Sequence, residues 1–378
     1  MKVYIIQYFL FFLVFRVNLI AQNVEQEYQS LVKSREYTKA LNKVEEGIKQ
    51  NPSNYPLYLL QVEGSLYLYS SNKDTSEQLL NKAYQHLLKY LQYNKINDTF
   101  KTLSAQLSIP IYRKAAIYMN FEQYNLAKDW FSKTIQLKSW ANEKDNDLFF
   151  YTGLSAYNAE DYQLAEKYFS MLIQEKYNNA AVYEILANYY YQNKAYSKSK
   201  DIILNALNNR ISINKETEIL ILFILEHYNS CNEFNELNKQ YKWSKSDNVD
   251  FKKVIARIYY LCGDTISCIQ QYTEIYNKYP TDTTVLIQCG LVYYNRGIKY
   301  LQEAKNVIAK SDKNIDTYRK LKTLYIDDIK SAIFYIEHAL KYNVSSQKVI
   351  LCLYKCYKHL QRKEEMVKLK SKYPFLND

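Results

Sequence analysis

The 378-residue chain contains few of the residues that make tight turns, with only six glycines and five prolines. An all-β protein needs many such turns, and a loop that cradles phosphate groups needs several glycines close together. Histidine is scarce as well, with four in the chain and no two within five residues of each other. The patterns HExxH, GxSxG and GxxxxGK are absent. The hypotheses of a zinc peptidase, a serine hydrolase or a P-loop enzyme therefore have no motif to support them.

The N-terminus has the features of an export signal. Lys2 precedes the apolar run VYIIQYFLFFLVF, and the small residue Ala21 stands at a plausible cleavage point before Gln22. The run is shorter than the ~20 residues of a membrane span. We expect a signal peptide over residues 1–21 and a periplasmic, cell-envelope-associated or secreted protein that is not an integral membrane protein after cleavage. An uncleaved anchor is the alternative.

The chain carries a formal charge of +11, and residues 22–378 carry +9 without the two cations of the predicted signal. No run of five or six like charges appears, so we expect a modest basic excess spread over a large surface. Such a surface has a mild preference for acidic partners or anionic membranes. The lysine-rich end YKHLQRKEEMVKLKSKYP is expected to be a solvated face rather than a nucleic-acid site, since no aromatic residues are interleaved for stacking on bases.

Two segments in the middle of the chain repeat each other. Residues 151–172 and 184–207 align when the second is shifted back by 34 residues, which is the period of one class of helical repeat. The shift places Gly153 on Ala187, and Tyr162 on Tyr196. Each segment predicts two short amphipathic helices around a polar turn.

This pattern resembles the tetratricopeptide repeat, a helix–turn–helix unit with small residues at positions 8, 20 and 27 and aromatic residues at 11, 17 and 24. REYTKALNKVEEGIKQNPSN, for example, places Tyr37 at 17 and Ala40 at 20. All six glycines fit positions for a small or turn residue: Gly64, Gly153 and Gly290 at 8, Gly263 and Gly297 at 15, and Gly47 at 27. The resemblance implies an all-α fold, a right-handed superhelical α-solenoid.

About nine units fit between residues 24 and 374. We divide them into an N-terminal array, 24–211, and a C-terminal array, 212–374, whose last unit is a capping pair. The second unit is stretched, and a linker is expected to follow it as far as Pro110. The eighth unit carries about 30 extra residues beyond the usual repeat, which predicts a long helical hairpin at about 286–342 with Asp312–Asn314 at its tip. The hairpin is either a partner-binding or dimerisation arm, or a stiffening elaboration.

The six cysteines all lie in the C-terminal half, at positions 231, 262, 268, 289, 352 and 356. Buried cysteine commonly acts as a small hydrophobic residue, and we expect this role first for all six. An exported chain meets an oxidising environment, where Cys262 or Cys268 paired with Cys289 is the disulfide to test first. Cys352 and Cys356 are four apart on one helix face, where a disulfide is awkward and a zinc site lacks ligands.

In tetratricopeptide arrays the first helices line a concave groove, with positions 2, 5, 9, 12 and 13 facing inward. Position 12 is tyrosine in the fourth, fifth, seventh and eighth units, which would suit an extended peptide or a helix. The Lys and Asn with which some family members hold a terminal carboxylate are replaced by Glu25 and Gln29. The resemblance implies these groove residues: Phe150, Tyr157, Asn158, Glu184, Asn188, Tyr191, Lys253, Arg257, Tyr260, Tyr294 and Asn295.

Together these observations predict a non-enzymatic scaffold for protein–protein interaction, with a peptide or protein partner of unknown identity. We expect no cofactor, no metal and no nucleic acid. Two alternatives remain: a glycan-binding module that uses the tyrosine-lined groove, or a structural spacer that self-associates through the extended hairpin. The oligomeric state is left open.

Overall fold

The computed structural model describes residues 23–71, 76–310, 315–343 and 346–376, and its regular elements within these ranges are all helices. The predicted signal peptide and the predicted hairpin tip lie outside the described residues. No described helix is both long enough and apolar enough to cross a membrane.

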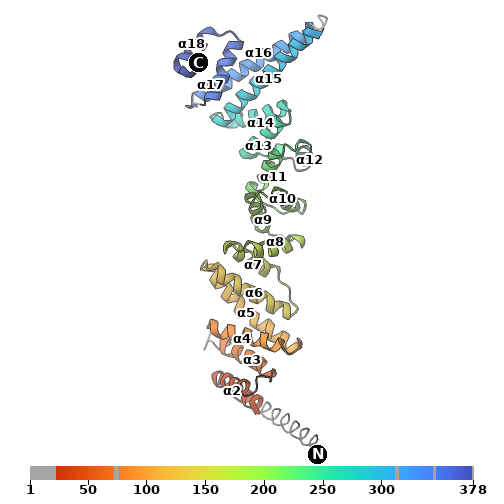
Figure 1. Ribbon diagram of the computed structural model, residues 1–378, viewed down its shortest axis with the longest axis vertical. Helices are drawn as coiled ribbons and strands as arrows, with labels where there is room; N and C mark the ends of the chain where they lie inside the picture. Colours follow the sequence, from red (N-terminus) through yellow and green to blue (C-terminus); the bar gives the residue numbers. More distant parts are fainter. Residues whose placement is uncertain (1–22, 72–75, 311–314, 344–345, 377–378) are drawn as a thin grey trace, which may run out of the picture. The chain divides into compact units, whose positions relative to one another are not determined.

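The first helix covers residues 23–33. The others, labelled in Figure 1, are α2 Tyr37–Gln50, α3 Pro56–Ser70, α4 Glu77–Leu91, α5 Asp98–Asn120, α6 Tyr124–Trp140, α7 Asn146–Asn158, α8 Tyr162–Gln174, α9 Ala180–Gln192, α10 Tyr196–Asn208, α11 Lys215–His227, α12 Cys231–Tyr241, α13 Val249–Leu261, α14 Thr265–Lys278, α15 Thr283–Lys310, α16 Ile315–Leu340, α17 Gln347–His359 and α18 Lys363–Lys372. Short 3₁₀ helices cover Trp243–Lys245 and Pro374–Leu376.

Consecutive helices of the described residues form nine hairpins, from the pair 23–33 with α2 to the pair α17 with α18. This confirms the predicted all-α solenoid. Contacts divide the chain into two compact units, which meet within α9: unit 1 ends at Leu186 and unit 2 begins at Ala187. We describe each unit by itself. The division between arrays after residue 211 was drawn from repeat counting, and it stays a prediction.

The turn inside a hairpin has the same backbone geometry wherever the repeat is regular. The residue at position 15 has a positive φ, close to 60° for Glu122, Glu160 and Lys194, and 81° for Gly263. The next amide closes the turn by donating to a carbonyl five residues back, as Asp264 does to Tyr259 at 2.9 Å. This is the left-handed end of a helix, which glycine adopts most easily. The repeat therefore sets the turn even where the residue is charged.

In unit 1, small residues lie where the two helices of a hairpin come closest. A Cβ added to Gly153 of α7 would lie 2.8 Å from the Phe169 ring of α8, closer than real contacts allow. Ala127 and Ala165 fill the corresponding places on the second helices and are buried. Because the helices lie this close, Phe169 is fully buried between them.

The expected linker before Pro110 is wrong. Residues 98–120 form one helix, α5, that begins with the Asn97 side chain accepting the Phe100 amide at 2.8 Å. Pro110 lies inside this helix and is buried. A proline removes one backbone hydrogen bond, but Leu107 and Ile111 beside it are fully buried in the core. Tertiary packing therefore outweighs the local preference of proline.

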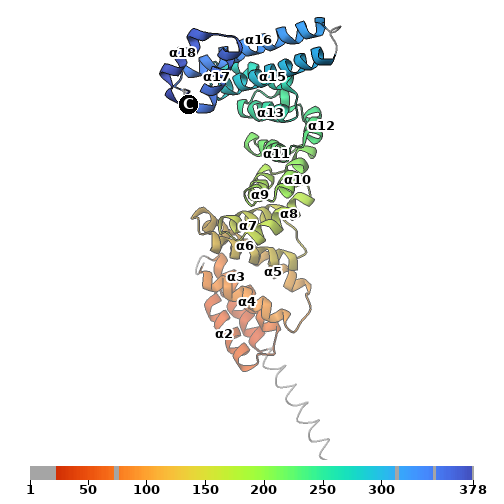
Figure 2. The ribbon, with the colours of Figure 1, turned by 45° about the horizontal axis from the view of Figure 1, so that its top comes forward.

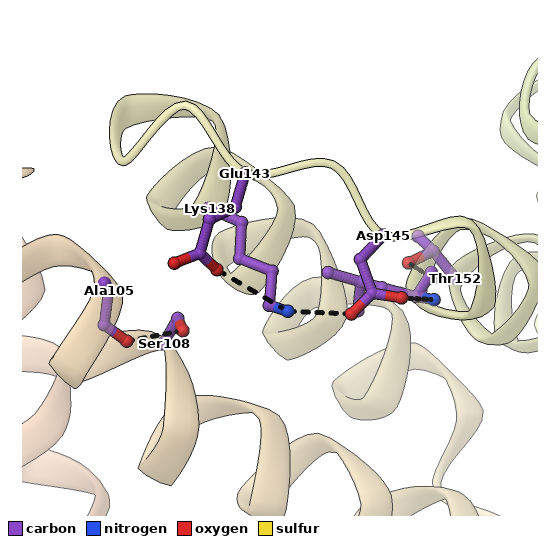
Figure 3. Close-up of polar contacts among 7 residues, drawn as sticks. Ala105, Ser108, Lys138, Glu143, Asp145 and Thr152 are labelled. Carbon is purple, nitrogen blue, oxygen red and sulfur yellow. Dashed lines mark hydrogen bonds and ion pairs between the residues drawn. The ribbon is translucent and has the colours of Figure 1, made fainter.

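Figure 3 shows how a polar group fixes the start of α7. The Asp145 carboxylate accepts the Leu148 amide at 3.0 Å as a helix cap, and Lys138 of α6 donates to it at 2.7 Å. Lys138 also lies 3.8 Å from Glu143. Burial alone would raise the pKa of Asp145, but the hydrogen bonds from Lys138 and the Leu148 amide hold that pKa below its usual value.

In unit 2, α15 and α16 form the predicted extended hairpin and lie side by side in Figures 1 and 2. Two glycines of α15 face α16. A Cβ on Gly290 would lie 2.4 Å from Ile336, and one on Gly297 would lie 3.2 Å from the Asp328 side chain. A regular unit turns at the position of Gly297, but α15 continues through it, as the predicted extended hairpin requires, and the glycine serves a close helix contact instead.

An ion pair lies beside this contact. Arg296 of α15 donates two hydrogen bonds of 2.7 Å to the carboxylate of Asp328 on α16, whose residue is only 5% exposed. The carboxylate raises the pKa of the arginine still further. A paired charge at this depth fixes how the two long helices align, because any shift would leave the buried Asp328 and the half-buried Arg296 without a partner.

The predicted cysteine pairings with Cys289 are wrong. Cys231, at the start of α12, forms a disulfide with Cys262, at the end of α13, with 5.6 Å between their Cα atoms. Cys268 and Cys289 are buried thiols, as are Cys352 and Cys356. The disulfide joins the turns of two successive hairpins. The sixth repeat lacks the small residues that mark register, so the position of Cys231 within the repeat cannot be assigned from the pattern.

We expect Gly290→Ala to destabilise the fold. Overpacking costs about 1–3 kcal/mol, which exceeds the ~1 kcal/mol that alanine gains over glycine within a helix. The free energy of unfolding, measured by denaturant titration, should fall accordingly. Ile336→Ala removes the atoms that clash, so the double variant should be more stable than the sum of the two single effects predicts. Simple additivity would contradict this contact.

Asp328→Asn should lower the free energy of unfolding by about 3 kcal/mol, since it leaves the Arg296 charge buried without its partner. The control is Asp316→Asn on the same helix, whose carboxylate is fully exposed and lies 3.9 Å from Arg319. That variant should unfold at the same denaturant concentration as the parent chain. Equal losses in both variants would refute the importance of burial here.

Removing the disulfide with Cys231→Ser and Cys262→Ser should lower the stability by about 3–4 kcal/mol, from the loop-closure entropy of the intervening chain. A reducing agent should destabilise the parent chain by a similar amount and leave this variant unchanged. Peptide mapping without reduction should find Cys231 linked to Cys262. A linkage that includes Cys289 would show that the pairing is wrong.

Candidate functional site

The candidate site is the face formed by the first helices of the hairpins in unit 2. These helices are α9 from Ala187 onward, α11, α13, α15 and α17, and we call their shared surface the first-helix face. Three hollows lie along it, each between neighbouring helices. Seven of the predicted groove residues belong to these helices: Asn188, Tyr191, Lys253, Arg257, Tyr260, Tyr294 and Asn295.

The first hollow, with a volume of about 360 Å³, lies between α9, α10 and α11. Tyr191 lines it, with its ring centre 5.3 Å from that of Tyr196. Burial raises the pKa of Tyr191, and Tyr196 and Glu226 add to the effect. Asn188, one turn earlier, donates to the Thr217 hydroxyl of α11 at 3.1 Å. Asn188 therefore holds two repeats together, while Tyr191 presents a ring at the surface.

The second hollow, of about 370 Å³, lies between α11 and α13 and is lined by Lys253 and Arg257. Both cations have partners within unit 2. Arg257 donates to the two carboxylate oxygens of Glu226 at 2.6 and 2.9 Å, and Lys253 lies 2.7 Å from Asp282. The hydrogen bonds from Arg257 also raise its pKa. These two ion pairs hold successive repeats together, and their acids balance the charges of Lys253 and Arg257.

The third and largest hollow, about 500 Å³, lies between α13, α15 and α17. Its α13 and α15 side chains include Tyr260, Tyr294 and Asn295, and its α17 side chains include Lys348, Leu351 and Lys355. We call it the lysine-lined pocket. Gln288, Leu291, Val292, Gln347 and Cys352 complete the lining, so none of the described residues around the pocket is acidic.

A hydrogen bond connects two of the predicted residues across this pocket. The Asn295 amide donates to the Tyr260 hydroxyl at 2.8 Å, which joins α15 to α13. Tyr260 is still 37% exposed, whereas Tyr294 is half-buried with its ring 6.2 Å from that of His359. Burial, followed by Cys352 and Cys356, raises the pKa of Tyr294. Both tyrosines offer rings and hydroxyl groups for contact.

Four predicted residues belong to unit 1. Phe150 packs within its own hairpin, with its ring 6.5 Å from Phe169 and 6.4 Å from Tyr177. Tyr157 meets Tyr162 edge-on at 5.6 Å, Asn158 is exposed, and Glu184 is half-buried on α9. Phe150 thus has a packing role in addition to any binding role. That these four residues share one groove with the residues of unit 2 stays a prediction.

The sequence pattern indicates only a terminal cap for α17 and does not show that this helix lines a pocket. Lys348, Leu351 and Lys355 follow one another at spacings of three and four, which places them on one helix face. That spacing was the available signal. Its meaning depends on the pocket wall that α13 and α15 supply, and a helical pattern alone does not show which neighbour a face meets.

The described residues offer little for catalysis. They contain no group of three or more His, Cys, Asp or Glu side chains arranged to hold a metal ion. Burial raises the pKa of the Cys268 thiol to about 12, far from the range of a reactive thiolate. The surface is instead made of rings, amides and charged groups, which is chemistry for binding.

No protein-family model matches the chain, and no curated protein matches it. Similar solved structures include a tetratricopeptide repeat protein from Bacteroides fragilis, which is 17% identical, with 67% of this chain and 98% of that chain covered and a TM-score of 0.34. The tetratricopeptide domain of P58(IPK) is 14% identical, with 90% and 98% covered and a TM-score of 0.30.

The TM-scores are low, so these structures add nothing about a binding site. The chain resembles tetratricopeptide repeat proteins through its own repeat positions, its hairpins and its turn geometry.

Proposed function

We propose that this protein is a non-enzymatic scaffold that binds a peptide or a protein on the first-helix face. The observation that carries the proposal is the series of hollows along successive first helices of unit 2. Each is large enough for one or a few side chains. Aromatic rings supply contact area at low entropic cost, and amides supply hydrogen bonds to a peptide backbone.

The disulfide between Cys231 and Cys262 supports the proposal that the chain is exported. Disulfides form and persist in oxidising compartments such as the bacterial periplasm and the extracellular space, and they are rare in the cytosol. The apolar N-terminal run with Lys2 before it points in the same direction. We therefore place the scaffold in the periplasm, at the cell envelope or outside the cell.

The proposal is tested by affinity capture from the source cell, followed by mass spectrometry. Tyr191→Ala together with Tyr260→Ala should remove the captured partner, since truncating a central aromatic side chain weakens binding roughly ten- to hundredfold. The control is Tyr279→Ala with Tyr342→Ala, which changes two similarly exposed tyrosines outside the first-helix face. Equal capture by all three chains would move the site elsewhere.

The two other hypotheses predict different results. A glycan-binding module would bind a glycan array through the same tyrosines and would capture no protein partner. A self-associating spacer would show a concentration-dependent mass in light scattering, unaffected by the tyrosine substitutions. The amide and charged groups around the lysine-lined pocket favour a peptide, because they match the polar groups of a backbone and its side chains.

A further inference from the structure

The positive charge of this chain is concentrated at one end. Residues 283–378 contain 18 Lys and Arg against 9 Asp and Glu, so this quarter of the chain carries +9 of the total +11. The basic excess is thus concentrated in the last quarter of the sequence. The segment includes α15 to α18, two of which form walls of the lysine-lined pocket.

Within this segment the pocket holds cations that are not paired. Lys253, Arg257 and Arg296 of unit 2 each have a carboxylate within 2.7 Å. Lys348 and Lys355 are exposed, and neither has an ion-pair partner among the described residues. Their charge is available to a ligand, whereas the cations of the second hollow are neutralised by their own chain.

The lysines are the groups that carry the positive charge around this pocket. His359 follows Lys355 by one turn, and burial together with the charges of Lys305, Lys358 and Lys355 lowers its pKa. The imidazole is therefore neutral, and it leaves the lysines as the charged groups of this region. Cations that have no internal partner and face a concave wall raise the local concentration of anions.

The pocket also has an apolar part. Leu351 lies between the two lysines on α17 and is 40% exposed, and Leu291 of α15 lines the pocket with it. An exposed leucine is unremarkable alone, but here it stands in a hollow with tyrosine rings beside it. An apolar side chain from a partner would cover it and remove that area from water.

We propose that the lysine-lined pocket binds an acidic peptide segment in which two carboxylates flank an apolar side chain. This inference rests on the proposed function and names the chemistry of its partner. Lys348 and Lys355 are two helical turns apart, a rise of about 10 Å. In an extended β-type peptide, residues i, i+2 and i+4 lie on one side, which puts an apolar residue between two acids about 13 Å apart. Glutamates or aspartates at that interval would reach both lysines.

The amides favour a peptide over other anions. Gln288, Asn295 and Gln347 offer both donors and acceptors, which suits a peptide backbone and not a phosphate. The pocket is a hollow between three helices, so the flat surface of a bilayer would meet only its rim. An anionic lipid surface is accordingly the outcome to exclude, rather than the partner we infer.

The experiment measures fluorescence anisotropy of the full chain with a labelled peptide that has two glutamates four apart and a leucine midway between them. Matched peptides carry glutamine in place of glutamate, or serine in place of leucine. The acidic peptide should bind, and each replacement should weaken binding at least fivefold. Lys348→Gln and Lys355→Gln should each weaken it roughly five- to tenfold, as for charged hydrogen bonds that are partly exposed.

Lys330→Gln with Lys358→Gln is the charge-matched control, since both lysines are exposed and neither lines the pocket. It should bind the peptide as tightly as the parent chain. Equal binding of the glutamate and glutamine peptides would overturn the inference, as would an equal loss in the control. Binding to phosphatidylglycerol vesicles that needs Lys348 and Lys355, with no peptide binding, would assign the pocket to a membrane instead.

The two proposals fail separately. If capture depends on Tyr191 and Tyr260 but the acidic peptide does not bind, the scaffold stands and the chemistry inferred for this pocket is wrong. If the acidic peptide binds and capture does not depend on the tyrosines, the pocket stands and the wider face is not the site. Failure of both experiments would remove the first-helix face as a binding surface.

Discussion

The fold depends on close contact between the two helices of a hairpin, which is possible only where one helix has a very small residue. Gly153 lies against Phe169 in unit 1, and Gly290 lies against Ile336 in unit 2, each without room for a Cβ. This contact sets the distance between the helices and their rotation about their own axes. Once rotation is fixed, every other position of the repeat has a defined direction, inward or outward.

The pairs of adjacent tyrosines show this consequence most clearly. Tyr190 is buried in the core, while its neighbour Tyr191 lines a hollow at the surface. The Tyr259 hydroxyl accepts a hydrogen bond from the Asn238 amide at 2.9 Å, and Tyr259 does not line the lysine-lined pocket. Its neighbour Tyr260 lines this pocket. One residue of each pair stabilises the solenoid and the next is available for binding. A run of tyrosines is thus divided between buried and surface positions by a rotation of about 100° per residue.

The sequence predicts the features that follow from the repeat period. It does not predict contacts between residues that lie far apart in the chain. The hairpins, the extended pair α15 and α16, and the outward tyrosines all follow from positions within one repeat. The continuity of α5 through Pro110 depends on core packing from neighbouring helices, and the Cys231–Cys262 disulfide depends on an irregular sixth repeat.

The candidate groove divides in the same way. Repeat positions selected Tyr260, Tyr294 and Asn295 as residues that face the groove, and these three line one pocket. The same positions could not show that Arg257 is held by Glu226 and Lys253 by Asp282, because an ion pair is decided by which acid the adjacent repeat presents. Repeat position identifies a side chain that faces outward, but only its partners show whether its charge is free.

This distinction explains why the location of charge is more informative here than its total. In the solenoid, a cation between two helices is stabilised when a neighbouring helix supplies an acid. Several cations of unit 2 have such an ion pair. On α17, Lys348 and Lys355 have no such acid beside them among the described residues. These outward lysines therefore keep their charge and their hydration, so an acidic ligand can pair with them without first displacing an internal partner. Helix α17 differs in this respect from α13 and α15, although all three are first helices of their hairpins.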